Sequence, residues 1–183
     1  MHDTKTRIAS DLERSFSAQG FAEQGVEALR AEADVSLRTL YKYFPSREAM
    51  IVGALEHRHS TYNEWLAGGP TEGLEYVLYP LVRLGDWLSQ VANTGCLFMN
   101  ALAEYPDSEA IKQTVIAHKT ELADQFRTRL ERTAPGRDIQ HLADTLFLLH
   151  EGMTQAARLQ GRDKAIEAAM RAAQAALRAE NIG

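Results

Sequence analysis

The junction at Pro45 constrains the fold of this chain most, because two helices must meet there with almost no loop. Ser36 favours the N-terminus of a helix, and Leu40 and Phe44, four residues apart, share the face that can enter a core. Pro45 ends that helix, and Ser46 can begin the next one at once. The sequence therefore predicts a short helix that is followed directly by a longer one.

The remaining face of this short helix carries positive charge and aromatic hydroxyls. Between Val35 and Arg47 there are three cations and no carboxylate. A solvated helix usually mixes both signs of charge, so a face of one sign indicates contact with phosphate. The pattern is typical of the recognition helix of a helix-turn-helix, which lies in the major groove of DNA.

Composition favours an all-α globular protein. Pro is scarce, at five residues, and hydrophobic residues make up 45% of the 183-residue chain. The net charge of −5 excludes a globally basic protein, and residues 1–50 hold seven Lys and Arg against eight Asp and Glu. Any contact with nucleic acid must therefore come from a local patch.

Cysteine usage and hydropathy indicate a cytosolic protein. Cys96 is the single cysteine, which excludes a disulfide within the chain. The first residues, Met1–Arg7, hold no apolar run, so we expect no signal peptide. No apolar run is long enough to cross a bilayer, so we expect no membrane partner.

Helical periodicity predicts two regions along the chain. A helix-turn-helix head would occupy residues 1–48, and a helical bundle for effector binding and dimerisation would occupy residues 49–183. A helix over residues 46–67 would link the two, and Gly68-Gly69-Pro70 is the clearest break after it. Three helices are expected in the head, over about residues 4–19, 26–33 and 36–44.

The last two expected helices differ in character. Residues 138–159 are apolar around most of the helix, whereas residues 163–179 carry a narrow seam of small residues. This pair suits an obligate helical dimer interface, so we expect a homodimer through the two C-terminal helices. A single internal bundle without a dimer is the alternative.

The second region also offers apolar and aromatic residues with a few polar groups. Such a lining suits a pocket for a small, largely apolar effector. The candidate residues are Tyr62, Trp65, Trp87, Phe98, Met99, Asn100, His118, Phe147, His150 and Met153. Plain core packing is the alternative for each of them.

The sequence holds few of the residue patterns that are typical of catalytic or metal-binding sites. His57 and His59 are two residues apart and would point to different helix faces, so they would chelate one ion poorly. The sequence has no cysteine pair, no His-Glu-x-x-His motif and no glycine-rich phosphate loop. We expect no enzyme, no metal and no cofactor.

Residues Thr39–Ala49 run Thr-Leu-Tyr-Lys-Tyr-Phe-Pro-Ser-Arg-Glu-Ala. This block resembles the TetR/AcrR family of bacterial repressors, and the resemblance covers about residues 4–52. Gly95–Ala101 and Glu104–Asp107 are similar, more weakly, to the effector domain of one branch of that family. The resemblance implies a ligand-responsive homodimeric regulator, with repression as the expected outcome, that binds a palindromic operator and is released by a small effector.

The resemblance also implies roles for individual residues. Arg38 and Thr39 would reach base edges, and Tyr41 and Lys42 would hold phosphates. The expected DNA-binding set is Ser36, Leu37, Arg38, Thr39, Tyr41, Lys42, Tyr43 and Arg47. A solvated surface role or a packing role is the alternative for these side chains.

Three positions depart from the pattern of the family. Gln24 or Gly25 stands where Thr often caps the second helix, and Asp34 stands where Gly is usual at the turn. Asp tolerates the left-handed backbone region better than most residues, so the turn is expected to survive. Leu37 replaces a residue that is more often polar or basic, which predicts contact with a thymine methyl group.

Two further classes of function remain open. The head could serve a helical protein-interaction or adaptor module without DNA, and a helical enzyme is a more distant possibility. Salt separates the first of these from a regulator, because phosphate contacts make affinity fall steeply with salt concentration.

Overall fold

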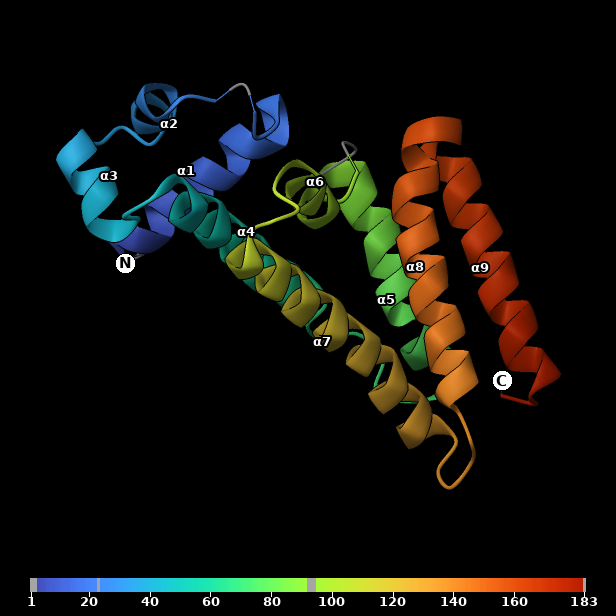
Figure 1. The fold of residues 1–183 in the computed structure, drawn as a ribbon. Helices are drawn as coiled ribbons and strands as arrows, with labels where there is room; N and C mark the ends of the chain where they lie inside the picture. Colours follow the sequence, from blue (N-terminus) through green and yellow to red (C-terminus); the bar gives the residue numbers. More distant parts are fainter. Residues whose placement is uncertain (1–2, 23, 92–94, 183) are drawn as a thin grey trace. The chain divides into compact units, whose positions relative to one another are not determined.

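The computed structural model describes residues 3–22, 24–91 and 95–182, and within these ranges every regular element is a helix (Figure 1). The all-α prediction is confirmed. None of these helices is long and apolar enough to span a lipid bilayer. The helices are α1 (Thr4–Gln19), α2 (Val26–Glu32), α3 (Leu37–Tyr43), α4 (Arg47–Trp65), α5 (Gly73–Gln90), α6 (Leu97–Glu104), α7 (Glu109–Thr133), α8 (Gln140–Gln160) and α9 (Arg162–Ala179).

Packing divides the chain into two compact units. Unit 1 comprises Met1–Glu64 and Cys96–His118, and unit 2 comprises Trp65–Gly95 and Lys119–Gly183. The chain passes into unit 2 at the end of α4, returns to unit 1 between Gly95 and Cys96, and enters unit 2 again within α7. This division differs from the boundary expected between residues 48 and 49, because α6 and the first part of α7 pack with the head.

Short-range hydrogen bonds set the turn between α2 and α3. Asp34 has φ +46°, in the left-handed region that Asp tolerates. The hydroxyl of Ser36 accepts a hydrogen bond from the backbone N–H of Thr39 at 3.0 Å and so caps α3. The predicted turn and cap are both present, and they fix the entry of α3.

The junction between α3 and α4 is as tight as Pro45 predicts. The Ser46 hydroxyl accepts a hydrogen bond from the backbone N–H of Ala49 at 3.0 Å and caps α4. A Cβ at Gly53 would lie 2.3 Å from a ring carbon of Phe44. The absent side chain of Gly53 therefore lets the Phe44 ring lie directly against α4.

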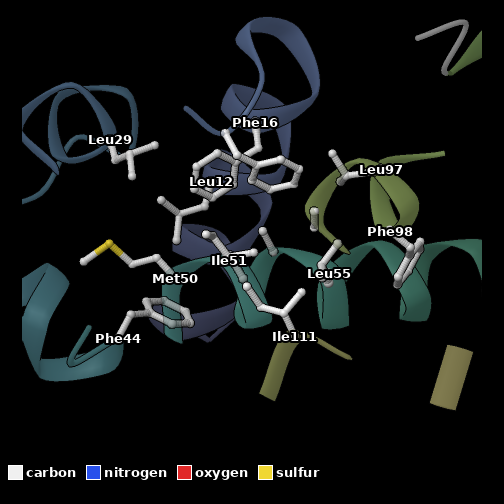
Figure 2. Close-up of a cluster of buried hydrophobic side chains, with 14 of the residues drawn as sticks. Leu12, Phe16, Leu29, Phe44, Met50, Ile51, Leu55, Leu97, Phe98 and Ile111 are labelled. Atoms are coloured by element: carbon white, nitrogen blue, oxygen red, sulfur yellow. The ribbon is translucent and has the colours of Figure 1, made fainter. Parts of the chain in front are cut away.

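The core of unit 1 joins the head to α4, α6 and the start of α7. Figure 2 shows side chains from these elements converging, and each of those that it labels is at most 7% exposed. Burying this many large side chains is the main force that holds unit 1 together. The labelled residues are Leu12, Phe16, Leu29, Phe44, Met50, Ile51, Leu55, Leu97, Phe98 and Ile111.

Unit 2 is built around α5, α8 and α9, which lie against one another (Figure 1). α9 buries a seam of small residues that ends at Leu177, and this seam allows close approach of the neighbouring helices. Gly85 in α5 assists, because a Cβ there would lie 3.3 Å from the side chain of Ile166. The seam predicted from the sequence is therefore used within the unit.

Candidate DNA-binding interface and effector region

The exposed face of α3 carries most of the residues expected to contact DNA. Leu37 is 37% exposed and Tyr41 is 44% exposed, while Leu40 on the opposite face is fully buried. Arg38 and Lys42 are also exposed. α3 therefore presents two cations, a phenol and an apolar side chain on one short surface, and its inward face anchors it to the core.

Other members of the expected set have structural roles as well. The hydroxyls of Ser36 and Thr39 lie 2.9 Å apart, so the two side chains form one polar cap at the start of α3. Tyr43 is half-buried against the core of unit 1. The ammonium of Lys42 lies 5.2 Å from the centre of the Tyr43 ring, a cation–π contact that orients the lysine.

Arg47 is engaged within unit 1. Its guanidinium donates hydrogen bonds to the backbone carbonyls of Phe21 and Gln24, and its Nε donates to the hydroxyl of Tyr105 at 3.1 Å. These bonds tie the segment between α1 and α2 and the end of α6 to the start of α4. The expected contact of Arg47 with DNA stays a prediction beside this structural role.

A buried ion pair fixes α4 against α1. The carboxylate of Glu13 pairs with both Arg58 and His57, and Arg58 also donates to the hydroxyl of Ser17 at 2.8 Å. Arg58 is only 7% exposed, so its charge is compensated where water cannot reach it. Sequence reasoning missed this arrangement, because its partners lie more than 40 residues apart.

Five of the expected effector residues belong to unit 1. Phe98 stacks on His118 with ring centres 3.7 Å apart and planes within 2°, and Tyr62 lies edge-on at 6.1 Å. His118 Nδ1 also lies 3.0 Å from His59 Nδ1, which requires one ring nitrogen to donate and the other to accept. Met99 is 39% exposed, and Asn100 is half-buried.

The other five expected effector residues belong to unit 2. Trp65 donates from its indole nitrogen to the carbonyl of Arg83 at 2.9 Å, and its ring lies 5.6 Å from that of Trp87. His150 and Met153 are buried, and Phe147 is half-buried. The ten residues are thus divided equally between the two units, and within each unit some of them pack against one another.

His150 lies in a charged but buried setting. Burial lowers the pKa of His150, and its Nδ1 lies 3.4 Å from the Glu151 carboxylate. For Glu151, burial alone would raise the pKa, but the contacts with His150 and with the ammonium of Lys119 outweigh it and lower the pKa to about 2. Among the described residues, no group of three His, Cys, Asp or Glu side chains could hold a metal ion.

One face of α8 is apolar and uncovered in the single chain. Leu148 is 67% exposed and Leu159 is 87% exposed, and with Gly152 and Ala156 they fall on one stripe at helical spacing. A Cβ at Gly152 would meet nothing within 4 Å. A groove of about 210 Å³ between α8 and α9 runs beside this stripe.

The turn, cap and exposed basic helix of the head define a helix-turn-helix. Comparison with known protein families gives the same class. The family model of bacterial regulatory proteins of the tetR family matches residues 11–54. The family model of the tetracyclin repressor-like C-terminal domain matches residues 82–173, half of the chain. The chain belongs to the TetR family, as its sequence motifs indicated.

Individual relatives extend over the whole chain. The HTH-type transcriptional repressor NemR of Escherichia coli K12 is 26% identical over 182 residues, which cover 92% of this chain and 91% of the relative. The crystal structure of SCO4454, a TetR-family regulator from Streptomyces coelicolor, has a TM-score of 0.86 at 24% identity and covers 96% of this chain and 94% of its own. A cysteine mutant of the TetR-family regulator CifR, complexed with 26-base-pair operator DNA, has a TM-score of 0.72 at 23% identity over 94% of this chain and 96% of its own.

Membership in this family settles the class of function. The protein is a ligand-responsive, DNA-binding transcriptional regulator and not an enzyme.

Proposed function

We propose that α3 is the recognition helix of this regulator and that its exposed face enters the major groove. Leu37, Arg38 and Thr39, in the first turn, would face base edges, and Tyr41 and Lys42 would hold phosphates on one side of the groove. The observation that carries this assignment is the exposed face of α3, which bears cations and no carboxylate.

We further propose that the regulator works as a homodimer through α8 and α9. The apolar stripe along α8 supports this, because exposed leucines beside an open glycine suit a second copy of the same surface. Two heads would then bind a palindromic operator, with half-site centres about 34–36 Å apart or a multiple of one helical turn. We expect the regulator to repress transcription and to be located in the cytoplasm.

A small, largely apolar effector would act through the part of unit 1 that follows residue 95. Arg47 bonds to Tyr105, and the hydroxyl of Ser108 donates to the carboxylate of Glu48, so the start of α4 is tied to the turn between α6 and α7. A shift of that turn would therefore move α4 and the head with it. All ten expected effector residues remain predictions, and the five in unit 1 are our candidates for the contacts that cause such a shift.

The first experiment measures binding of the purified protein to the DNA upstream of its own reading frame, with a scrambled duplex as control. Tight, sequence-selective binding that falls steeply with salt supports the assignment, because each neutralised phosphate releases counterions. Binding that is equal on both duplexes, or that is insensitive to salt, favours a protein-interaction module in place of an operator-binding head.

The role of a candidate effector is tested by linkage. If effector and operator prefer different conformations, each weakens the affinity for the other by the same factor. A ligand that saturates the protein and leaves operator affinity unchanged is not an inducer.

A further inference from the structure

Arg129 in α7 is a buried cation with an unusual set of partners. Its side chain is 7% exposed, and its Nη1 donates to the backbone carbonyl of Tyr76 at 3.0 Å. The guanidinium carbon lies 4.5 Å from the centre of the Tyr76 ring and 5.5 Å from that of Tyr79. Among the described residues, its Nε has no hydrogen-bond acceptor, and the groups that act electrostatically on its charge are Tyr76 and Tyr79.

A comparison with Arg58 shows what is missing. Arg58 is equally buried, at 7% exposed, and is compensated by the carboxylate of Glu13. Arg129 instead lies against the rings of Tyr76 and Tyr79, and burial lowers its pKa although the two tyrosines oppose the shift. A guanidinium stays protonated even so, and a buried charge without a counter-charge is costly. A ligand in contact with this guanidinium could supply the missing counter-charge.

Arg129 lies in the wall of a pocket within unit 2. The pocket has a volume of about 290 Å³, near the lower end of the range for small-molecule sites. Its wall adds an amide from Gln125 and a hydroxyl from Thr128, both able to donate to a second oxygen. The lining residues are Tyr76, Glu121, Asp124, Gln125, Thr128 and Arg129.

We propose that this pocket binds a small molecule through a single carboxylate group, which accepts hydrogen bonds from the guanidinium of Arg129. Planar, paired donors of a guanidinium match the two oxygens of a carboxylate. Glu121 and Asp124 in the same wall disfavour a dianion such as phosphate, because they add negative charge beside it. None of the six lining residues is among the expected effector residues, so the site goes beyond the proposed function.

The test compares benzoate with benzamide, which has the same shape and no charge, by calorimetric titration of the full-length protein without DNA. We expect benzoate to bind at least about tenfold more tightly, as a charge-assisted hydrogen bond predicts. In Arg129→Gln that preference should vanish. In Arg127→Gln, which removes an exposed arginine two residues away that pairs with Asp124, it should persist.

A second variant keeps the test decisive if Arg129→Gln fails to fold. Gln125→Glu retains the buried arginine but places a carboxylate in the pocket wall, and it should lower benzoate affinity severalfold while leaving benzamide unchanged. Equal affinity of the wild-type protein for benzoate and benzamide, or binding of neither, would overturn the proposal. Tighter binding of inorganic phosphate than of benzoate would also overturn it. Because no DNA is present, each of these results leaves the proposed operator binding untouched.

Discussion

Units 1 and 2 satisfy their buried groups in different ways. In unit 1 the apolar side chains of the head, α4, α6 and early α7 form one cluster, and the buried arginine Arg58 has a carboxylate partner. In unit 2 the stripe on α8 leaves Leu148 and Leu159 in solvent, and the buried arginine Arg129 has no carboxylate partner among the described residues.

This difference shows where outside partners are needed. In unit 1, the buried apolar side chains and the buried charge find their partners within the unit. Such a unit can move as one body, which suits a head that must keep the geometry of α3. A unit with an exposed apolar stripe and an uncompensated charge gains free energy when something covers the stripe or pairs with the charge. We therefore propose that unit 2 binds the second copy and the small carboxylate ligand, and that unit 1 binds DNA and responds to the apolar effector.

The largest expected effect comes from the core of unit 1. Phe16 is 1% exposed, and its ring centre lies 4.8 Å from that of Phe21. Phe16→Ala should lower the free energy of unfolding by about 3–5 kcal/mol, because it removes buried contacts and leaves a cavity. Urea denaturation measures this change. A loss below about 1 kcal/mol would contradict a well-packed unit 1.

Arg47 tests whether the start of α4 is tied to both neighbouring segments. Arg47→Met removes the donors to Phe21, Gln24 and Tyr105 and should cost about 1.5–3 kcal/mol of stability. Arg14→Met, at an exposed arginine of α1, is the matched control and should cost at most about 1 kcal/mol. An equal loss of unfolding free energy in the two variants would show that the hydrogen bonds of Arg47 do not stabilise unit 1.

A substitution in the apolar stripe of α8 tests whether this surface of unit 2 binds a second copy of the chain. Leu148→Glu places a charge on a residue that is 67% exposed, so the fold of the single chain should be unchanged. In a dimer the same charge would be buried, and we expect dimer affinity to fall by at least about tenfold. Sedimentation velocity over a range of concentrations measures this. An unchanged dimer would place the interface elsewhere.

Acid should destabilise unit 2 through His150. Its pKa is lowered by burial, so the unfolded chain binds a proton at a higher pH than the folded chain does. Stability should therefore fall as pH drops below about 6.5, by at most about 1.4 kcal/mol per pH unit. Glu151, with a pKa of about 2, adds a further loss only as pH falls below its ordinary value of 4.5.

Urea denaturation between about pH 7.5 and about pH 5.5 checks the contribution of His150. His150→Gln should flatten the dependence, because the titrating group is gone. His141→Gln is the control, since His141 lies on the same helix with 55% of its side chain exposed, and it should leave the dependence in place. A wild-type protein with no loss of stability over this range would contradict the assignment to His150.

Local signals in the sequence were sufficient for the head. The caps at Ser36 and Ser46 each bond to a residue three positions away, and the backbone bonds at the Asp34 turn span at most five positions, so a short stretch of sequence contains these partners. Proline inside a helix usually bends or ends it, so Pro80 alone does not tell whether one helix or two cover its neighbourhood. The structure has one helix, α5, through that position.

Long-range partners could not be predicted. The position of Arg47 at the start of α4 predicts a contact with the DNA backbone, but it gives no sign of the bond to Tyr105, which lies 58 residues away. The pocket at Arg129 was also missed, although a signal was present: Arg129 follows the buried Phe126 by three positions and so falls on the apolar face of α7. A charged residue in such a register indicates a buried charge that requires a partner.

The salt dependence of operator binding in Lys42→Ala tests the central claim most directly. Lys112→Ala, at an exposed lysine of α7, is the matched control. If α3 lies in the major groove, Lys42→Ala should weaken binding on every DNA sequence and reduce the slope of log affinity against log salt by about one, while Lys112→Ala leaves the slope unchanged. Arg38→Ala should instead relax specificity at a single base pair. If Lys42→Ala and Lys112→Ala gave the same slope as the wild-type protein, α3 would not be the helix that contacts the phosphates.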